Sequence, residues 1–257
     1  MVEDLSRKGW RKAFLLVSLM VRFTIRFFKE VWRPPYEFNE IVKQSYQVGY
    51  KSLPLVGITA FIMGLVLTVQ FRPSLADFGA VSWLPSLIAL SLIKEIGPVI
   101  TALICAGKVG SSIGAELSSM KVTEQIDAME VSGANPFNYL VVTRVISTTL
   151  MIPMLVIFAD AIGLIGSFAA VNITDSMGFK LFLKMALASV DFFDVLPAFI
   201  KTIFFGLVIG IVGTYQGYNS ENGTEGVGKA ATSAVIIGSL MVFIIDMIAV
   251  QITALFS

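Results

Sequence analysis

The sequence predicts an all-α integral membrane protein with five transmembrane helices, preceded by amphipathic helices at the membrane interface. Hydrophobic residues make up 56% of the 257 residues and charged residues only 14%, and the mean hydropathy is +0.82. Several apolar runs are long enough to span a bilayer, because about 20 helical residues cross a hydrocarbon core of about 30 Å. We expect one membrane domain at residues 52–257, after a basic interfacial region at residues 1–51.

The N-terminal region mixes basic side chains with aromatic and aliphatic ones. Residues 1–51 contain ten of the 19 lysines and arginines: Arg7, Lys8, Arg11, Lys12, Arg22, Arg26, Lys29, Arg33, Lys43 and Lys51. A helix of this composition lies in the headgroup plane, where its basic groups meet anionic lipid. The alternative is a signal peptide over Ala13–Val21, but Arg22 and Arg26 interrupt it and no small-residue cleavage site follows. We expect an uncleaved helix and, from the positive charge, a cytoplasmic N-terminus.

Five apolar runs are predicted to cross the membrane. They are Leu53–Phe71, Leu84–Ala106, Val145–Val171, Val195–Tyr215 and Ala230–Phe256. The second run is followed by sequence that can continue the helix towards Glu116. The stretch Met177–Ser189 is amphipathic and too short to span, so we place it at the surface between the third and fourth spans. Five crossings from a cytoplasmic N-terminus put the C-terminus outside.

A short charged segment separates the second span from the third. Lys121–Pro136 reads KVTEQIDAMEVSGANP, and its acids are Glu124, Asp127 and Glu130. The residues favour a helix, which Gly133 and Pro136 would end. Charged residues of this kind belong in water, and the number of crossings puts them in the cytoplasm. A membrane protein that keeps a folded, charged helix there offers it to a soluble partner.

Five ionisable residues fall inside the predicted spans: Lys94, Glu95, Asp160, Lys201 and Asp246. A charge at the bilayer centre costs about 3 kcal/mol on insertion scales, so each should face protein or a wet cavity. One interpretation is mutual pairing that only stabilises the fold, and the other is a polar lining for a substrate headgroup. We favour a lining role for Lys94 and Glu95, because neighbours on a helix point about 100° apart and cannot satisfy one partner on one face. For Asp160 we favour the structural interpretation.

Several kinds of chemistry are excluded or disfavoured. The chain has no histidine, the commonest general base and metal ligand, and its single cysteine, Cys105, permits no disulfide framework or thiolate cluster. We therefore expect no catalytic residues, no metal and no cofactor. Gly223–Ala230 reads GTEGVGKA, one residue short of a phosphate-binding loop, with Ala230 in place of Ser or Thr and no preceding strand. We interpret it as a glycine-rich turn before the last helix.

A long central run resembles a known family. Glu95–Arg144, EIGPVITALICAGKVGSSIGAELSSMKVTEQIDAMEVSGANPFNYLVVTR, closely resembles the MlaE/YrbE permeases of bacterial lipid ABC transporters. The downstream GTEGVGKAATSAV and the order of the spans match as well, so the resemblance covers about residues 45–256. It implies a multi-pass permease of the bacterial inner membrane that moves phospholipid to or from a periplasmic MCE-protein route and maintains outer-membrane lipid asymmetry.

The resemblance also implies partners. Two permease copies would sit at the centre of the complex, bound to a pair of cytoplasmic ABC ATPase subunits and carrying a ring of periplasmic MCE-domain subunits. The family pattern also admits a small STAS-domain subunit. ATP hydrolysis would occur in the separate ATPase chains, so this chain would be a transporter subunit and not an enzyme. No nucleic acid is implied.

Family roles carry over to particular residues. Glu124–Gly133 resembles the coupling helix that seats in a groove of the ATPase. The ATPase-coupling residues would be Glu124, Gln125, Asp127, Ala128, Met129 and Gly133. The lipid-binding residues would be Leu65, Val69, Gln70, Lys94, Glu95, Lys201 and Asp246.

Packing arguments add two expectations. One five-span bundle encloses too little volume for a two-chain lipid, so we expect a homodimer. Small residues of the fifth span would allow close helix contact; they are Ala230, Ala231, Ser233, Ala234, Gly238 and Ser239. In the coupling helix, apolar Ile126, Met129 and Val131 suit insertion into a partner groove. In the fourth span, Gly206 and Gly210 predict close packing.

Two other functions remain open at this stage. An ion-coupled carrier would use the intramembrane acids as proton sites. A membrane-embedded enzyme that modifies lipids would have to rely on carboxylates or lysine, since histidine is absent. Dependence of transport on a partner's ATP hydrolysis separates the permease from the carrier.

Overall fold

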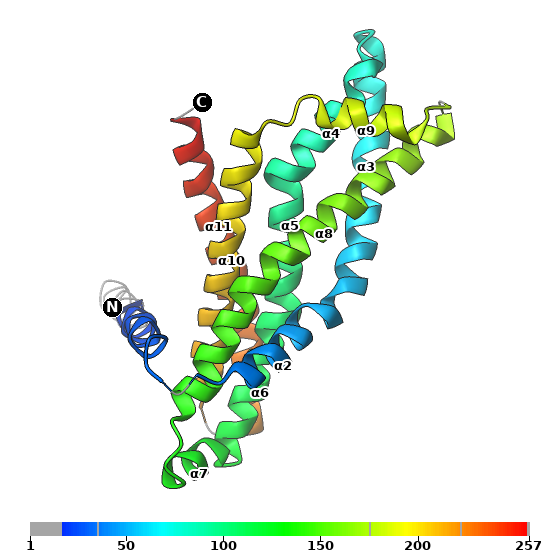
Figure 1. Ribbon diagram of the computed structural model, residues 1–257. Helices are drawn as coiled ribbons and strands as arrows, with labels where there is room; N and C mark the ends of the chain where they lie inside the picture. Colours follow the sequence, from blue (N-terminus) through cyan, green and yellow to red (C-terminus); the bar gives the residue numbers. More distant parts are fainter. Residues whose placement is uncertain (1–16, 35, 175, 222, 256–257) are drawn as a thin grey trace, which may run out of the picture.

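The computed structural model describes residues 17–34, 36–174, 176–221 and 223–255, and all regular structure within these ranges is helical (Figure 1). This confirms the predicted all-α class. Among these residues, five helical segments are long and apolar enough to cross a membrane: Phe38–Asp77, Val81–Val122, Phe137–Ile173, Phe192–Tyr218 and Thr224–Ala254. Two predictions lie partly outside the described residues. They are the part of the basic interfacial region before residue 17 and the end of the fifth span at Phe256.

Two amphipathic helices lie at one end of the bundle, the lower end in Figure 1. The first covers residues 17–30, and the second, α2, covers Phe38–Val48. The first is fastened by an aromatic contact, because Phe23 packs edge-on against Phe137 with ring centroids 5.1 Å apart. Both helices belong to the region predicted to be interfacial; their location in the headgroup plane stays a prediction.

The first two spans form a helical hairpin. A 3₁₀ turn, η1 (Tyr50–Ser52), leads into α3 (Leu53–Asp77), which runs to the opposite end of the molecule (Figure 1). The turn η2 (Val81–Trp83) then begins the second span. This span is a chain of five helical pieces: α4 (Leu84–Ser91), η3 (Leu92–Ile96), α5 (Gly97–Cys105), η4 (Ala106–Gly110) and α6 (Ser111–Val122). The pieces η3 and η4 are π-helical, and the span passes Glu116 as the sequence predicted.

The other elements complete the bundle. They are α7 (Gln125–Val131), the π-helical η5 (Phe137–Val142), α8 (Thr143–Thr174), α9 (Phe179–Leu187), α10 (Phe192–Tyr218) and α11 (Thr224–Ala254). Helix α7 projects at the same end as α2, whereas α9 lies across the opposite end, beside α4 (Figure 1). The structure thus has a short helix where the charged segment predicted one, and another within Met177–Ser189.

Glycines let the central helices approach backbone to backbone. A Cβ added at Gly64 of α3 would lie 1.9 Å from the Gly163 carbonyl oxygen of α8, and one at Gly206 of α10 would lie 2.6 Å from the Thr148 carbonyl oxygen of α8. Small residues allow this proximity in membrane helices, where dispersion contacts drive association. The close packing expected of Gly206 is therefore confirmed, and α8 is the central helix that contacts α3, α10 and α2.

The small residues of the last helix pack inside the same chain. Ala230, Ala234 and Gly238 are buried. A Cβ at Gly114 of α6 would lie 3.1 Å from the Ala230 carbonyl oxygen, and one at Gly238 would lie 3.6 Å from the Ala106 side chain. The expectation that these three serve contact between copies is wrong, because α6 and η4 already occupy them. The exposed face of α11 carries large apolar residues instead: Ile236, Leu240, Phe243 and Met247.

Candidate functional site

Three predicted charged residues meet within the bundle. Lys201 of α10 donates to Glu95 Oε2 at 2.7 Å and to Asp246 Oδ1 at 2.9 Å. The Lys201 side chain is 5% exposed, whereas that of Glu95 is 44% exposed. The cluster therefore joins η3, α10 and α11. With all three groups ionised it carries one excess negative charge, and its open side is the Glu95 carboxylate.

The π-helical turn η3 directs the two adjacent charges to different partners. Glu95 contacts Lys201, whereas Lys94 Nζ donates to Asp194 Oδ1 at 2.7 Å. Asp194 lies seven residues before Lys201 on α10, which is about 10 Å along the helix axis. Lys94 is thus separate from the Lys201 cluster. Insertions of this kind in a helix often occur at functional sites, since they redirect side chains.

Asp160 lies on the other side of η3. Its Oδ1 atom is buried and has no hydrogen-bond partner among the described residues. A Cβ at Gly97 would lie only 1.9 Å from that oxygen and 2.8 Å from the Leu92 carbonyl oxygen. The expected structural pairing of Asp160 with a base is therefore not seen in this part of the chain. Instead, Asp160 of α8 packs closely against Gly97, the first residue of α5 after the π-helical turn.

The predicted lipid-binding residues separate into two groups. Leu65, Val69 and Gln70 lie on α3, and the side chains of Val69 and Gln70 are exposed. Helix α3 packs on α8, α4 and α5, whereas Lys201 and Asp246 belong to α10 and α11. Within one chain, the α3 residues do not join the charged cluster, because α8 and the second span lie between them.

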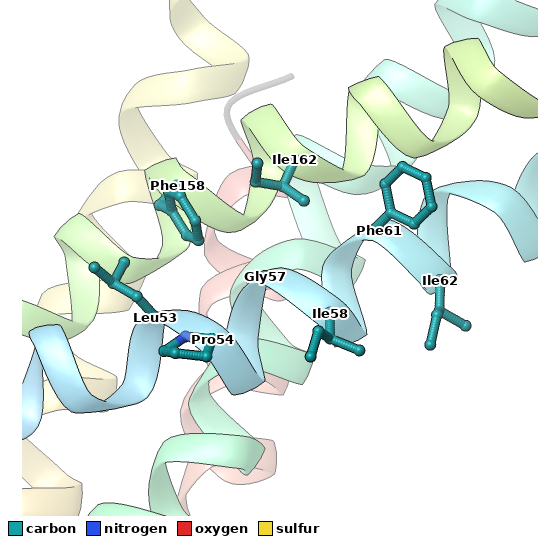
Figure 2. A pocket seen from close by; sticks show the side chains of 8 residues that line it. All are labelled: Leu53, Pro54, Gly57, Ile58, Phe61, Ile62, Phe158 and Ile162. Carbon is teal, nitrogen blue, oxygen red and sulfur yellow. The ribbon is translucent and has the colours of Figure 1, made fainter.

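An apolar groove runs between α3 and α8. Its volume is about 520 Å³, and Figure 2 shows the side chains that border it. They are Leu53, Pro54, Gly57, Ile58, Phe61, Ile62, Phe158 and Ile162. A groove with only apolar residues can accommodate hydrocarbon, but it offers no group to orient a polar ligand.

The predicted coupling residues lie on α7 and on the residues that flank it. Glu124 has a left-handed backbone, φ 57°, directly before α7, and Gly133 has φ 79° two residues after the helix ends at Val131. Glu124, Gln125, Asp127, Ala128 and Gly133 are all exposed. The helix ends at the glycine that the sequence indicated, because glycine adopts the left-handed conformation without strain.

The apolar face of α7 points inward. Ile126 is 5% exposed and belongs to the core of its own chain, and Met129 packs against that core. The expectation that Ile126 enters a partner groove is therefore wrong, whereas the partner contact expected of partly buried Met129 stays a prediction. Val131, by contrast, is 90% exposed. A helix this short needs tertiary anchoring, so its two apolar residues hold it in place while its acids stay accessible.

Sequence reasoning missed two partners of the charged residues. Asp194 was not expected to bind Lys94, although Asp191 and Asp194 form a reciprocal cap at the start of α10. The D-x-x-D spacing before an apolar run was the signal that could have found this helix start. The second is Glu116, which accepts from buried Arg144 at 2.8 Å. The available signal was an acid before α7, Glu116, and a base after it, Arg144, which could pair across the segment.

Comparison with known proteins decides the family. The family described as Permease MlaE matches residues 41–252. The chain belongs to the MlaE permease family. A probable ABC transporter permease protein of Rickettsia typhi is 36% identical over 228 residues, which are 89% of this chain and 88% of that protein. A probable ABC transporter permease protein of Synechocystis sp. is 34% identical over 203 residues, covering 79% and 77% of the two chains.

The chain is also similar to a plant protein. The chloroplastic protein TRIGALACTOSYLDIACYLGLYCEROL 1 of Arabidopsis thaliana is 31% identical over 211 residues, which are 82% of this chain and 60% of that protein. Together with the five apolar helices among the described residues, these similarities identify the MlaE-family chain as a multi-pass permease subunit of a transporter. The predicted resemblance to this family is confirmed.

Proposed function

We propose that this chain is the permease of an ATP-driven transporter that moves phospholipid between the bacterial inner membrane and a periplasmic MCE-protein route, and so maintains outer-membrane lipid asymmetry. The observation that carries the proposal is the Lys201 cluster, a buried base with two acids inside a largely apolar bundle. Intramembrane charges of this kind mark substrate pathways. The name of the Arabidopsis relative, which is that of a galactolipid, supports a lipid substrate.

Lys201 is the group suited to a phosphate. Its ammonium donates to Glu95, whose side chain is 44% exposed, and a lipid phosphate can replace that carboxylate. Attraction between unlike charges is stronger in a low dielectric, while desolvation limits the gain. Glu95 and Asp246 then neutralise Lys201 when lipid is absent. Lys94, with a side chain 43% exposed, supplies a second positive charge about two turns of α10 away.

The acyl chains need an apolar path near these charges. Exposed Val69 and partly exposed Leu65 of α3 provide such a surface, and Gln70 adds a polar group. Because α3 and the Lys201 cluster lie apart within one chain, one cavity containing both groups requires a second copy. We propose that the transporter contains a homodimer and that the lipid lies between the two copies.

Helix α7 is the proposed contact with the ATPase. Glu124, Gln125, Asp127 and Ala128 are exposed at the end of the molecule that also holds α2 (Figure 1). We place this end in the cytoplasm, with the N-terminal helices in the headgroup plane of the inner membrane. The opposite end, with α9, would then face the MCE-domain subunits. A STAS-domain subunit would bind on the ATPase side.

An ion-coupled carrier is the second candidate. The observation that favours it is Asp160, whose buried Oδ1 has no partner among the described residues. Carboxyl groups in such surroundings bind protons in carriers. Family membership favours the ATP-driven permease, because the relatives are named ABC transporter permeases.

Reconstitution with the candidate ATPase separates the two functions. The complex would be placed in vesicles that contain fluorescent phospholipid, with a photocrosslinking residue at Leu65 or Gln70. We expect transport that needs ATP, survives collapse of the proton gradient and gives lipid adducts at these positions. Transport that continues without ATP and stops with the gradient would contradict the proposal. Adducts only on the outward face of the protein would move the lipid pathway elsewhere.

A further inference from the structure

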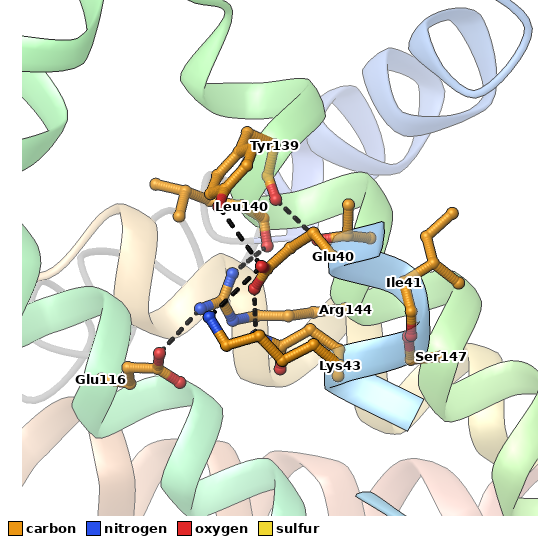
Figure 3. Close-up of polar contacts among 10 residues, drawn as sticks. Glu40, Ile41, Lys43, Glu116, Tyr139, Leu140, Arg144 and Ser147 are labelled. Carbon is orange, nitrogen blue, oxygen red and sulfur yellow. Dashed lines mark hydrogen bonds and ion pairs between the residues drawn. The ribbon is translucent and has the colours of Figure 1, made fainter. Parts of the chain in front are cut away.

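One ion pair closes the base of the segment that contains α7. Arg144, the second residue of α8, donates through Nη2 to Glu116 Oε1 at 2.8 Å and through Nη1 to the Leu140 carbonyl at 3.0 Å (Figure 3). Glu116 belongs to α6, which precedes α7, and Arg144 follows the π-helical η5. The pair therefore joins the chain before α7 to the chain after it.

Helix α2 is fastened to the same place. Its Glu40 carboxylate accepts a hydrogen bond from the Tyr139 hydroxyl of η5 at 3.2 Å. One turn further along α8 from Arg144, Ser147 Oγ donates to the Ile41 carbonyl of α2 at 2.9 Å. Figure 3 shows these contacts side by side with the Arg144–Glu116 pair. Three neighbouring sets of polar contacts, together the polar cluster of this junction, thus join α2, η5, α8 and α6.

Arginine is suited to this junction. The Arg144 side chain is only 3% exposed, although burial of a charge is costly and replacement by apolar residues is often neutral. The guanidinium is a rigid planar fork, so it holds two acceptors, here Leu140 and Glu116, in one fixed geometry. Lysine would keep the charge but not this geometry. A role in positioning explains why a buried cation stands at this point of a membrane protein.

We propose that Arg144 is a positioning residue that makes the α7 segment and α2 one mechanical unit, so that a displacement of α7 carries α2 with it. The inference rests on the proposed function in one respect, namely that the ATPase displaces α7. A displacement of α7 driven by ATP hydrolysis would then move two parts of the chain. One is the transmembrane core, and the other is α2 at the membrane surface. Helix α2 is then part of the transmission and not only an anchor.

Distance measurements in the assembled transporter test this linkage. Spin labels would be placed at Gln47→Cys of α2 and Ser132→Cys after α7, both exposed, in a Cys105→Ala background. In the otherwise unchanged protein, we expect the same narrow α2–α7 distance with and without ATP. In Arg144→Met, the distribution of α2–α7 distances should be broader, and its mean should change with nucleotide. A distance that already changes with ATP when Arg144 is intact would overturn the proposal.

Transport per ATP hydrolysed is the second measurement. We expect Arg144→Met to bind the ATPase normally but to lose about tenfold in this ratio, because small misplacements have large kinetic effects. Arg144→Lys should restore part of it. The matched control is Lys229→Met, which removes an exposed ion pair with Glu225 outside the cluster. An unchanged ratio in Arg144→Met would overturn the proposal.

Milder variants keep the test decisive if Arg144→Met does not fold. Tyr139→Phe removes only the hydroxyl that binds Glu40, and Glu116→Gln removes only the negative charge. Each should broaden the α2–α7 distance, and unchanged distances in both would overturn the linkage. The proposed function fails separately: if charge reversal on α7 leaves ATPase binding intact, the ATPase contact is elsewhere, while a constant α2–α7 distance still supports the linkage.

Discussion

Lys201 is the residue on which two acids depend. It contacts both Glu95 and Asp246, and its own side chain is almost fully buried. Lys201→Met should therefore be the most damaging single change in the cluster, since breaking a buried pair costs about 3–5 kcal/mol. Asp246→Asn should be mild, because Lys201 keeps Glu95. Thermal unfolding in detergent and the amount of protein in the membrane measure this order.

A triple variant separates stability from transport. Glu95→Gln, Lys201→Met and Asp246→Asn together remove all three charges, so no charge of the cluster is left unpaired. We expect this protein to regain most of the stability lost in Lys201→Met but to remain defective in lipid transport. Recovery of transport along with stability would contradict a role for these charges in lipid binding.

Gly97 gives a second prediction at this scale. An alanine there would place its Cβ 1.9 Å from Asp160 Oδ1 and 2.8 Å from the Leu92 carbonyl oxygen, so the buried Asp160 side chain and the backbone of the π-helical turn would have to shift. We expect Gly97→Ala to lower the free energy of unfolding by about 1–3 kcal/mol, the usual cost of overpacking. Gly107→Ala is the matched control, because a Cβ there meets no described atom within 4 Å. Equal Tm values for the two variants would disprove the predicted clash.

The charged residues show what a sequence can and cannot specify. Mid-span Lys201, Glu95 and Asp246 are visible in the sequence, because each interrupts an apolar run, and mutual pairing of such charges was one of the two expected outcomes. Which acid meets which base depends on the rotation of each helix. Hydropathy does not encode that rotation when a helix is apolar all round, as α3 and α8 are. The partner of Lys94, Asp194, was missed because it lies just before the predicted start of the fourth span at Val195.

Each π-helical turn carries a side chain that binds another helix. In η3, Glu95 contacts Lys201; in η4, Lys108 donates to the Lys51 carbonyl; and in η5, Tyr139 donates to Glu40. An inserted residue shifts the helix register, so polar side chains leave the lipid-facing side and reach a neighbour. The sequence predicted the second span and its continuation towards Glu116, which contain η3 and η4, whereas the predicted third span began after η5. None of the turns themselves was predicted, because one extra residue does not change the hydropathy of a run.

Charge reversal on α7 tests the coupling helix. Glu124→Lys with Asp127→Lys should abolish ATPase stimulation and lipid transport, because both acids are exposed and unpaired bases would replace them. The chain should still insert and assemble, since Ile126 holds the helix through its own core. Asp77→Lys, an exposed acid at the opposite end, is the control. Coupled transport that survives the double change would rule out this contact.

The element boundaries followed local sequence signals unevenly. Gly133 and Gly223 adopt positive φ at the ends of the loops where the sequence put turns. Helix α8, however, begins directly after η5, before the predicted start at Val145, because Phe137 and Leu140 are buried and extend the apolar span. The inward orientation of Ile126 and Met129 was also missed, since a seven-residue helix has too few turns to show which face is buried.

The arrangement of the whole chain predicts opposite locations for its two ends. Five membrane-crossing segments among the described residues, with the charged α7 beside the N-terminal helices, give an odd number of crossings. The excess of basic residues near the N-terminus favours the cytoplasm for that end. A reporter enzyme active only in the periplasm should work when fused after Ser257 and fail when fused before Met1. The reverse pattern would invert the proposed topology.

The number of copies is a further prediction for the whole molecule. We expect native mass spectrometry of the solubilised transporter to find two copies of this chain. The exposed face of α11 is one surface available for contact, and Leu240→Cys in a Cys105→Ala background tests it through a disulfide between copies. Glu225→Cys, on the first turn of the same helix, is the exposed control. A complex with a single copy would contradict the dimer.

The glycine contacts limit how the helices of this permease can move relative to one another. Where Gly64 meets the carbonyl of Gly163, and Gly206 that of Thr148, no layer of side chains remains to bend or slide. Sliding of α3 or α10 along α8 would drive main-chain atoms into one another, so these three helices behave as a stiff block. A stroke that opens a path for lipid must then be a tilt of whole blocks against each other. The rearrangement would occur at the boundaries between these blocks, where larger side chains separate the helices and can change rotamer.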